Sequence, residues 1–263
     1  MEFEIPPDIS YYIDWFHSFS KGYLQGTAED KRNIQMKIDH SMRVLRVSEE
    51  IIDWLDLPSP TSGICRIAAL FHDVGRFDQY ARFQSYNDLK TVNHAAVGVK
   101  ILKKEGILAA IEPSHRRTIL AAVLLHNRHH LQDNLPVQVD LALRIIRDAD
   151  KIDIMSTIIE YFSNNEDRNA LLFGLKSDPE EYSKNILENI HSGAPVRYED
   201  LVWVNDFKLL VSGWLTGFSY PVSAKIAIDR GYLGKLLSFL PQDAQVQSLK
   251  PVIQRRLSAI VHP

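Results

Sequence analysis

The chain has only one cysteine, Cys65, among its 263 residues. A single cysteine excludes an intrachain disulfide and a zinc site built from several cysteines, and it is compatible with a reducing compartment. Because Cys65 lies within an apolar stretch of helical periodicity, we expect it to be a small core residue.

Long hydrophobic runs are also missing, since no uninterrupted apolar stretch approaches the roughly 20 residues of a membrane-spanning helix. The first residues, MEFEIPP, lack the basic start and the apolar core of a signal peptide. We therefore expect a soluble cytoplasmic protein with no membrane partner.

Neither sign of charge dominates. The chain has 30 lysines and arginines against 33 aspartates and glutamates, which gives a net charge of −3. That balance argues against an extended nucleic-acid surface, although it allows a local basic pocket. With 45% hydrophobic and 24% charged residues, the composition is that of a globular protein large enough to bury a sizeable core.

No stretch alternates apolar and polar residues as a half-buried strand would, and we find no internal repeat or coiled coil. Apolar residues instead recur at helical spacing, so the predicted fold class is all-α, a multi-helix bundle with a helical C-terminal extension. Residues 79–91 have no sustained period and predict a loop. Helices are predicted over residues 28–55, 93–106, 113–126, 136–162, 179–190, 198–215, 222–230 and 244–260.

Three regions are expected from this pattern. Residues 1–29 predict an N-terminal arm followed by a short packing helix, and residues 30–162 predict the core of the molecule. Residues 163–263 predict a helical extension that packs on the core, and their aromatic content also permits a homodimer contact.

The sequence Phe71-His72-Asp73 places an imidazole next to a carboxylate at the end of a buried apolar helix. A buried charge without a partner is costly, so such a pair normally meets a partner or a metal ion. Imidazole and carboxylate together suit Mn, Fe, Co, Ni or Zn, and a helical bundle can direct them inward. The other candidates on or at the ends of predicted buried helices are His40, His94, His126 and Asp150.

The contexts of these residues resemble the HD-domain superfamily of metal-dependent phosphohydrolases. Residues 40–44 (HSMRV) look like the family's first histidine helix, and residues 70–76 (LFHDVGR) look like its central motif. Residues 148–153 (DADKID) look like its closing motif, in which Asp150 is the better match to the final aspartate and Asp148 is a shifted alternative. The three motifs follow one another in the family's order.

The resemblance covers roughly residues 30–160 and implies a ligand set. Members with four ligands hold one metal ion, whereas members with two further histidines can hold a second. Asp73 would then bridge to a second ion held by His94 and His126. Two ions about 3.5–4 Å apart can activate a water and clamp the oxygens of a phosphate ester. The ligands implied for the first ion are His40, His72, Asp73 and Asp150.

The activity implied by the resemblance is hydrolysis of a nucleotide or other small phosphate ester by a metal-activated water, with Asp73, His94 and His126 as catalytic candidates. Nearby cations would stabilise charge on the phosphoryl oxygens. Arg76 and Lys151 are the first choices, because the family often has a basic residue at those places. The full set of candidate phosphate contacts, each within three residues of a proposed ligand, is Arg43, Arg76, Arg128 and Lys151.

Two other classes of function fit the same residues. Some members of the superfamily hold a mixed-valent di-iron centre that activates oxygen, and such a protein would consume O₂ when loaded with iron. A non-catalytic metal- or nucleotide-binding protein would bind its ligand without turnover. If only one ion binds, His94 and His126 could line the substrate pocket instead. His129 and His130 predict a polar helix terminus.

Overall fold

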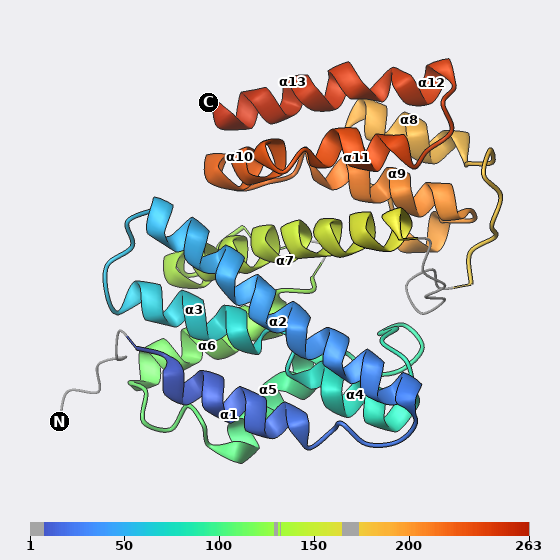
Figure 1. The fold of residues 1–263 in the computed structure, drawn as a ribbon. Coiled ribbons are helices and arrows are strands. Elements are labelled where there is room, and N and C mark those ends of the chain that lie inside the picture. Colours follow the sequence, from blue (N-terminus) through green and yellow to red (C-terminus); the bar gives the residue numbers. More distant parts are fainter. Residues whose placement is uncertain (1–7, 129–130, 132, 165–173, 263) are drawn as a thin grey trace. The chain divides into compact units, whose positions relative to one another are not determined.

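The computed structural model describes residues 8–128, 131, 133–164 and 174–262 (Figure 1). Regular structure in these ranges is helical, and the only bridge between extended residues in them pairs Lys176 with Trp203. The all-α prediction is therefore confirmed. No helix in the described ranges is long and apolar enough to cross a membrane. The chain divides into two compact units, Met1–Asp150 and Lys151–Pro263.

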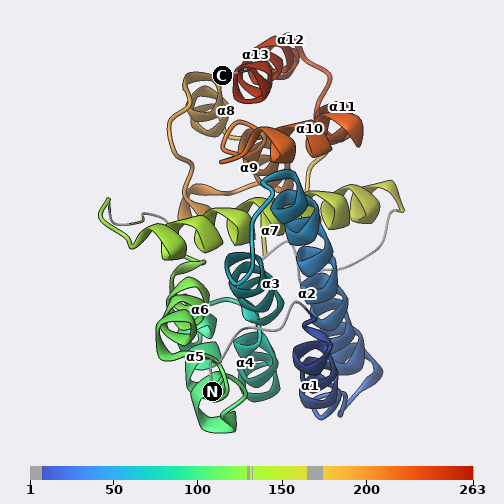
Figure 2. The ribbon, with the colours of Figure 1, turned by 90° about the vertical axis from the view of Figure 1, so that its left-hand side faces the viewer.

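In its described residues, the first unit contains six complete helices and the beginning of a seventh. Helix α3 packs against α2 on one side and α6 on the other, as Figure 2 shows, while α5 packs against α4 and α6. This arrangement places the C-terminal ends of α3 and α6 near the N-terminal end of α5. The helices are α1 (Ser10–Lys21), α2 (Ala28–Trp54), α3 (Thr61–Phe71), α4 (Gly75–Phe83), α5 (His94–Glu105), α6 (Pro113–Leu125) and α7 (Val137–Ser163).

Capping residues determine where several of these helices begin and end. Thr27 and Asp30 form a reciprocal capping box at the start of α2. The Asn93 side chain accepts a hydrogen bond from Ala96 N at the start of α5, and Gly106 ends that helix in the left-handed region, with φ of 66°. The predicted positions of α2 and α5 are confirmed.

The loop predicted over residues 79–91 is partly wrong, because α4 continues to Phe83. Phe77 and Tyr80, one turn apart, are buried on its inner face, and Gln84 in the left-handed region then ends the helix. Nine residues are too few to establish a helical period.

The second unit consists of the end of α7 and a set of shorter helices. Helix α9 packs against α8 and α11, and α13 packs against α10, α11 and α12. Buried Asp206, in the first turn of α9, accepts hydrogen bonds from the backbone N–H groups of Ser183, Val202 and Trp203. The elements are α8 (Lys184–Ser192), η2 (Tyr198–Asp200), α9 (Val204–Trp214), α10 (Pro221–Asp229), α11 (Tyr232–Ser238), α12 (Ala244–Gln247) and α13 (Leu249–Val261).

Gly75 lies where the start of α4 approaches α5 most closely. A Cβ at this position would overlap the carbonyl oxygen of His94 and would lie 2.5 Å from the backbone nitrogen of Gly98. Backbone atoms inside a packed helix pair cannot move aside as a flexible side chain can. Glycine is therefore required here for close approach of two helices.

We expect Gly75→Ala to lower the free energy of unfolding by about 1–3 kcal/mol, because the added methyl group overpacks the contact between α4 and α5. Urea unfolding measures this change. Gly234→Ala within α11 is the matched control. Among the described residues, no atom beyond Gly234's own neighbours and helix backbone lies within 4 Å of the added Cβ, so we expect stability to stay unchanged or to rise by up to about 1 kcal/mol. Equal stability of the two variants would contradict the close approach.

Candidate metal centre

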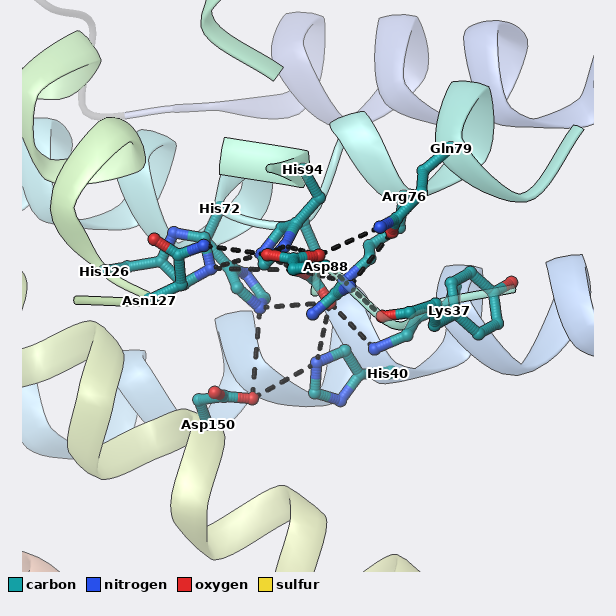
Figure 3. A network of polar contacts seen from close by, with 12 residues as sticks. Lys37, His40, His72, Arg76, Gln79, Asp88, His94, His126, Asn127 and Asp150 are labelled. Carbon is teal, nitrogen blue, oxygen red and sulfur yellow. Dashed lines mark hydrogen bonds and ion pairs between the residues drawn. The ribbon is translucent and has the colours of Figure 1, made fainter. Parts of the chain in front are cut away.

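The first ligand group joins side chains from three elements (Figure 3). His40 lies on α2, His72 and Asp73 directly follow α3, and Asp150 lies on α7. His40 Nε2 lies 3.3 Å from Asp150 Oδ1 and 3.5 Å from Asp73 Oδ2. His72 Nε2 lies 3.8 Å from Asp73 Oδ2 and 4.0 Å from Asp150 Oδ1. Each of these two histidines thus lies within 4.0 Å of both carboxylates.

The second group shares Asp73 with the first. His94 opens α5 and His126 directly follows α6, and their Nε2 atoms lie 3.0 Å apart. Asp73 Oδ1 lies 3.1 Å from His94 Nε2 and 3.7 Å from His126 Nε2. The two oxygens of this buried carboxylate therefore face different groups, Oδ2 the first and Oδ1 the second.

The spacing of the donor atoms fits metal coordination. Ligands about 2.1 Å from an ion are separated by about 3.0 Å at octahedral and about 3.4 Å at tetrahedral corners. The donor atoms of His40, His72 and Asp150, and those of Asp73, His94 and His126, lie within 4.8 Å of one another in each group. His72 Nε2 is buried and makes no hydrogen bond within the described part of the chain. An orphaned buried nitrogen is costly unless it has a ligand.

The backbone fixes the tautomers of two of these histidines. His72 Nδ1 lies 2.8 Å from the carbonyl oxygen of Ala69, and His126 Nδ1 lies 2.8 Å from that of Val123. A carbonyl oxygen only accepts, so each Nδ1 carries the hydrogen and donates it. The lone pair of each Nε2 therefore points into its ligand group, as a metal ligand requires.

For His94, a carboxylate instead of a backbone carbonyl accepts the hydrogen bond from Nδ1. Asp88, between α4 and α5, has Oδ2 2.6 Å from His94 Nδ1 and 3.0 Å from Asn127 Nδ2. Its Oδ1 accepts hydrogen bonds at 2.9 Å from Arg76 Nη1 and from Gln79 Nε2. Burial tends to raise the pKa of Asp88, but the hydrogen bond from His94 and the charge of Arg76 lower that pKa to about 2.

Two cations flank the shared carboxylate. Lys37 Nζ donates to Asp73 Oδ2 at 2.8 Å, and Arg76 Nε donates to Asp73 Oδ1 at 3.3 Å. Burial tends to raise the pKa of Asp73, but these two cations outweigh it and hold the pKa well below its usual range. Burial lowers the pKa of His72 to about 4. At neutral pH the carboxylate is ionised and this imidazole is neutral, which are the forms that bind metal.

Sequence reasoning missed Lys37 and Asp88. Lys37 lies one helical turn before His40, so its spacing carried a usable signal. Asp88 lies in an aperiodic segment, and no spacing relates it to a ligand. Of the two aspartates considered for the closing motif, Asp150 belongs to the ligand group, whereas Asp148 is buried outside it.

The four basic residues predicted to contact phosphate lie in different surroundings. Arg76 donates to the carboxylates described above, and Arg43 lies partly exposed on α2. The Arg128 side chain is exposed. Lys151 belongs to the second unit, where its ammonium donates to Gly217 O at 2.6 Å. Phosphate contact stays a prediction for all four. His129 and His130 lie outside the described residues.

Comparison with protein-family models gives one match, to the HD domain over residues 38–155. That range contains both ligand groups in full. Comparisons with curated proteins and with solved structures find no match. HD domains bind divalent metal ions and are typical of metal-dependent phosphohydrolases, which agrees with the histidine and aspartate groups. Residues 38–155 of the chain thus match the HD domain.

Proposed function

We propose that this protein is a phosphohydrolase or phosphodiesterase that uses two divalent metal ions to hydrolyse a nucleotide or another small phosphate ester. The observation that carries the proposal is the position of Asp73, whose two oxygens face different ligand groups. A carboxylate shared in this way would hold two ions, and a pair of ions about 3.5–4 Å apart suits displacement at phosphorus. The HD domain supports the same reaction class.

When bound, divalent ions lower the pKa of a coordinated water and polarise the phosphoryl oxygens. The chain's own residues prepare the site for them. The carbonyl oxygens of Ala69 and Val123 keep the Nε2 atoms of His72 and His126 unprotonated. Lys37 and Arg76 keep Asp73 ionised, so the centre is ready to bind cations without a prior loss of protons from that carboxylate.

Lys37 is also suited to contact the phosphate. Within the described part of the chain its ammonium donates one hydrogen bond, to Asp73 Oδ2, and its side chain is 17% exposed. An ammonium has three N–H donors, so two remain for a phosphoryl oxygen. Arg76, by contrast, donates to Asp73, Gln79, Asp88 and the carbonyl oxygen of Tyr86.

We expect Lys37→Met to lower kcat/KM by roughly 10²-fold while the bound metal stays unchanged, because a cation next to the developing phosphoryl charge is lost. Lys37→Arg should restore part of the rate. Steady-state kinetics and metal analysis of the same samples measure both quantities. Lys100→Met, at an exposed lysine of α5, is the control for loss of one positive charge. An unchanged kcat/KM in Lys37→Met would contradict the phosphate contact and leave Lys37 only the role of balancing the charge of Asp73.

The reaction class is tested by product release. Metal-stripped protein is loaded separately with Mn, Co, Ni and Fe and is given nucleotides, cyclic nucleotides and small phosphomonoesters. Metal-dependent release of phosphate or of a nucleoside monophosphate, absent in Asp73→Ala, is the expected result. No release with any substrate, together with O₂ uptake by the iron-loaded protein, would contradict the proposal and favour an oxygenase.

A further inference from the structure

Asp88 lies outside the two ligand groups, yet it contacts His94 and the residues around it. We propose that Asp88 is the positioning residue that builds the half of the centre formed by His94 and His126, and that it thereby determines whether the protein holds two ions or one. This inference rests on the proposed two-ion function and names the residue that controls how many ions are held.

The position of His94 explains why it needs such a residue. His72 and His126 follow the last turns of helices, where a carbonyl oxygen three residues earlier accepts from Nδ1. His94 is instead the first residue of α5, so no preceding turn of its own helix offers a carbonyl oxygen. The acceptor must come from another part of the chain, and Asp88 Oδ2, 2.6 Å from His94 Nδ1, supplies it.

Donors from two parts of the fold hold Asp88 in place. Arg76 and Gln79 on α4 reach Oδ1, and Asn127, just after α6, reaches Oδ2. Buried Gln79 also donates to Thr91 Oγ1 and to the carbonyl oxygen of Val92, which ties the same network to the residues just before α5. With donors on both oxygens, the carboxylate has a fixed orientation toward His94 (Figure 3).

Because the partners of Asp88 are all donors, a change to asparagine has a definite consequence. The carboxamide oxygen would accept from Arg76 and Gln79, and its NH₂ group would then face His94. His94 Nδ1 would become an acceptor, and its hydrogen would move to Nε2, where it blocks coordination. If Asp88 served only to pair with Arg76, the outcome would differ. Asp88→Asn would then lower the stability of the protein and change neither the His94 tautomer nor the number of bound ions.

The test counts ions in the folded protein. Equilibrium dialysis against Mn or Co, followed by metal analysis, should give two ions per chain for the unaltered protein and one for Asp88→Asn. Asp78→Asn is the matched control, since Asp78 is also an aspartate of this region but pairs with the exposed Arg82 at 3.2 Å. That variant should keep both ions.

A second measurement determines the tautomer of His94 directly. Nitrogen-15 NMR of the histidine rings in the metal-free protein should show His94 with its hydrogen on Nδ1, and in Asp88→Asn on Nε2. Two ions in Asp88→Asn, or an Nε2–H tautomer of His94 in the unaltered protein, would each overturn the inference and leave the two-ion function standing. One ion in the unaltered protein would overturn the inference together with the two-ion part of the proposed function. Absence of any bound ion from the unaltered protein would overturn the proposed function itself. If Asp88→Asn does not fold, the tautomer in the unaltered protein decides.

Discussion

Asp73→Asn should remove both ions from the protein and lower the rate of phosphate-ester hydrolysis by at least about 10³-fold. The two oxygens of Asp73 face different ligand groups, and a neutral amide is a poor substitute for a bridging carboxylate. Metal ions contribute several kcal/mol to such reactions, and each 1.36 kcal/mol corresponds to about a tenfold change in rate. Metal analysis and product release measure the two effects.

The Asp73→Asn substitution also tests whether this carboxylate contributes to the stability of the fold. Lys37 and Arg76 would each lose a charged acceptor, so we expect a moderate loss of stability, about 1–3 kcal/mol, with the helices retained in circular dichroism. Asp53→Asn is the control, because Asp53 on α2 is 71% exposed and contacts Arg66 at the surface. A folded Asp73→Asn protein that keeps both ions and its activity would show that Asp73 does not bridge.

Substitutions in only one of the two ligand groups should each remove only one ion. His126→Asn should remove one ion and leave the ion held by His40, His72 and Asp150, whereas Asp150→Asn should do the reverse. Each variant should lose roughly 10²-fold or more in rate, because clamping of the phosphate ester needs both ions. Metal analysis, with the electron paramagnetic resonance of Mn-loaded samples, distinguishes a single ion from a coupled pair.

The outcome of this pair of variants depends on the geometry at Asp73. His126 Nε2 lies 3.7 Å from Asp73 Oδ1, whereas Asp150 Oδ1 approaches His40 and His72 on the Oδ2 side. Loss of both ions in either variant would contradict separate half-sites. Retention of both ions in His126→Asn would remove His126 from the ligand set.

The helices that could be predicted are those with a clear start and end in the sequence. Asn93 and Gly106 delimit α5, and α2 is long enough for its apolar stripes to define its period. Helix α4 could not be predicted, because it has nine residues and opens with Gly75, which resembles a helix end. Gly75 serves instead to bring α4 close to α5, and a sequence alone does not reveal that close approach.

In the candidate site, too, only some of the residues could be predicted from the sequence. His40, His72, Asp73 and Asp150 could be proposed together because they occupy motifs in a recognisable order, and the structure brings them within ligand distance. Asp88 could not be predicted from the sequence, because its contacts depend on helices α4 and α5 meeting the end of α6. Contacts of that kind are made by tertiary packing and leave no periodic signal.

The most direct test of the two-ion centre is anomalous diffraction from crystals of the Mn- or Co-loaded protein. We predict two peaks about 3.5–4 Å apart on either side of Asp73, one near His40, His72 and Asp150 and the other near His94 and His126. A single peak, or peaks that do not share Asp73, would contradict the proposed centre.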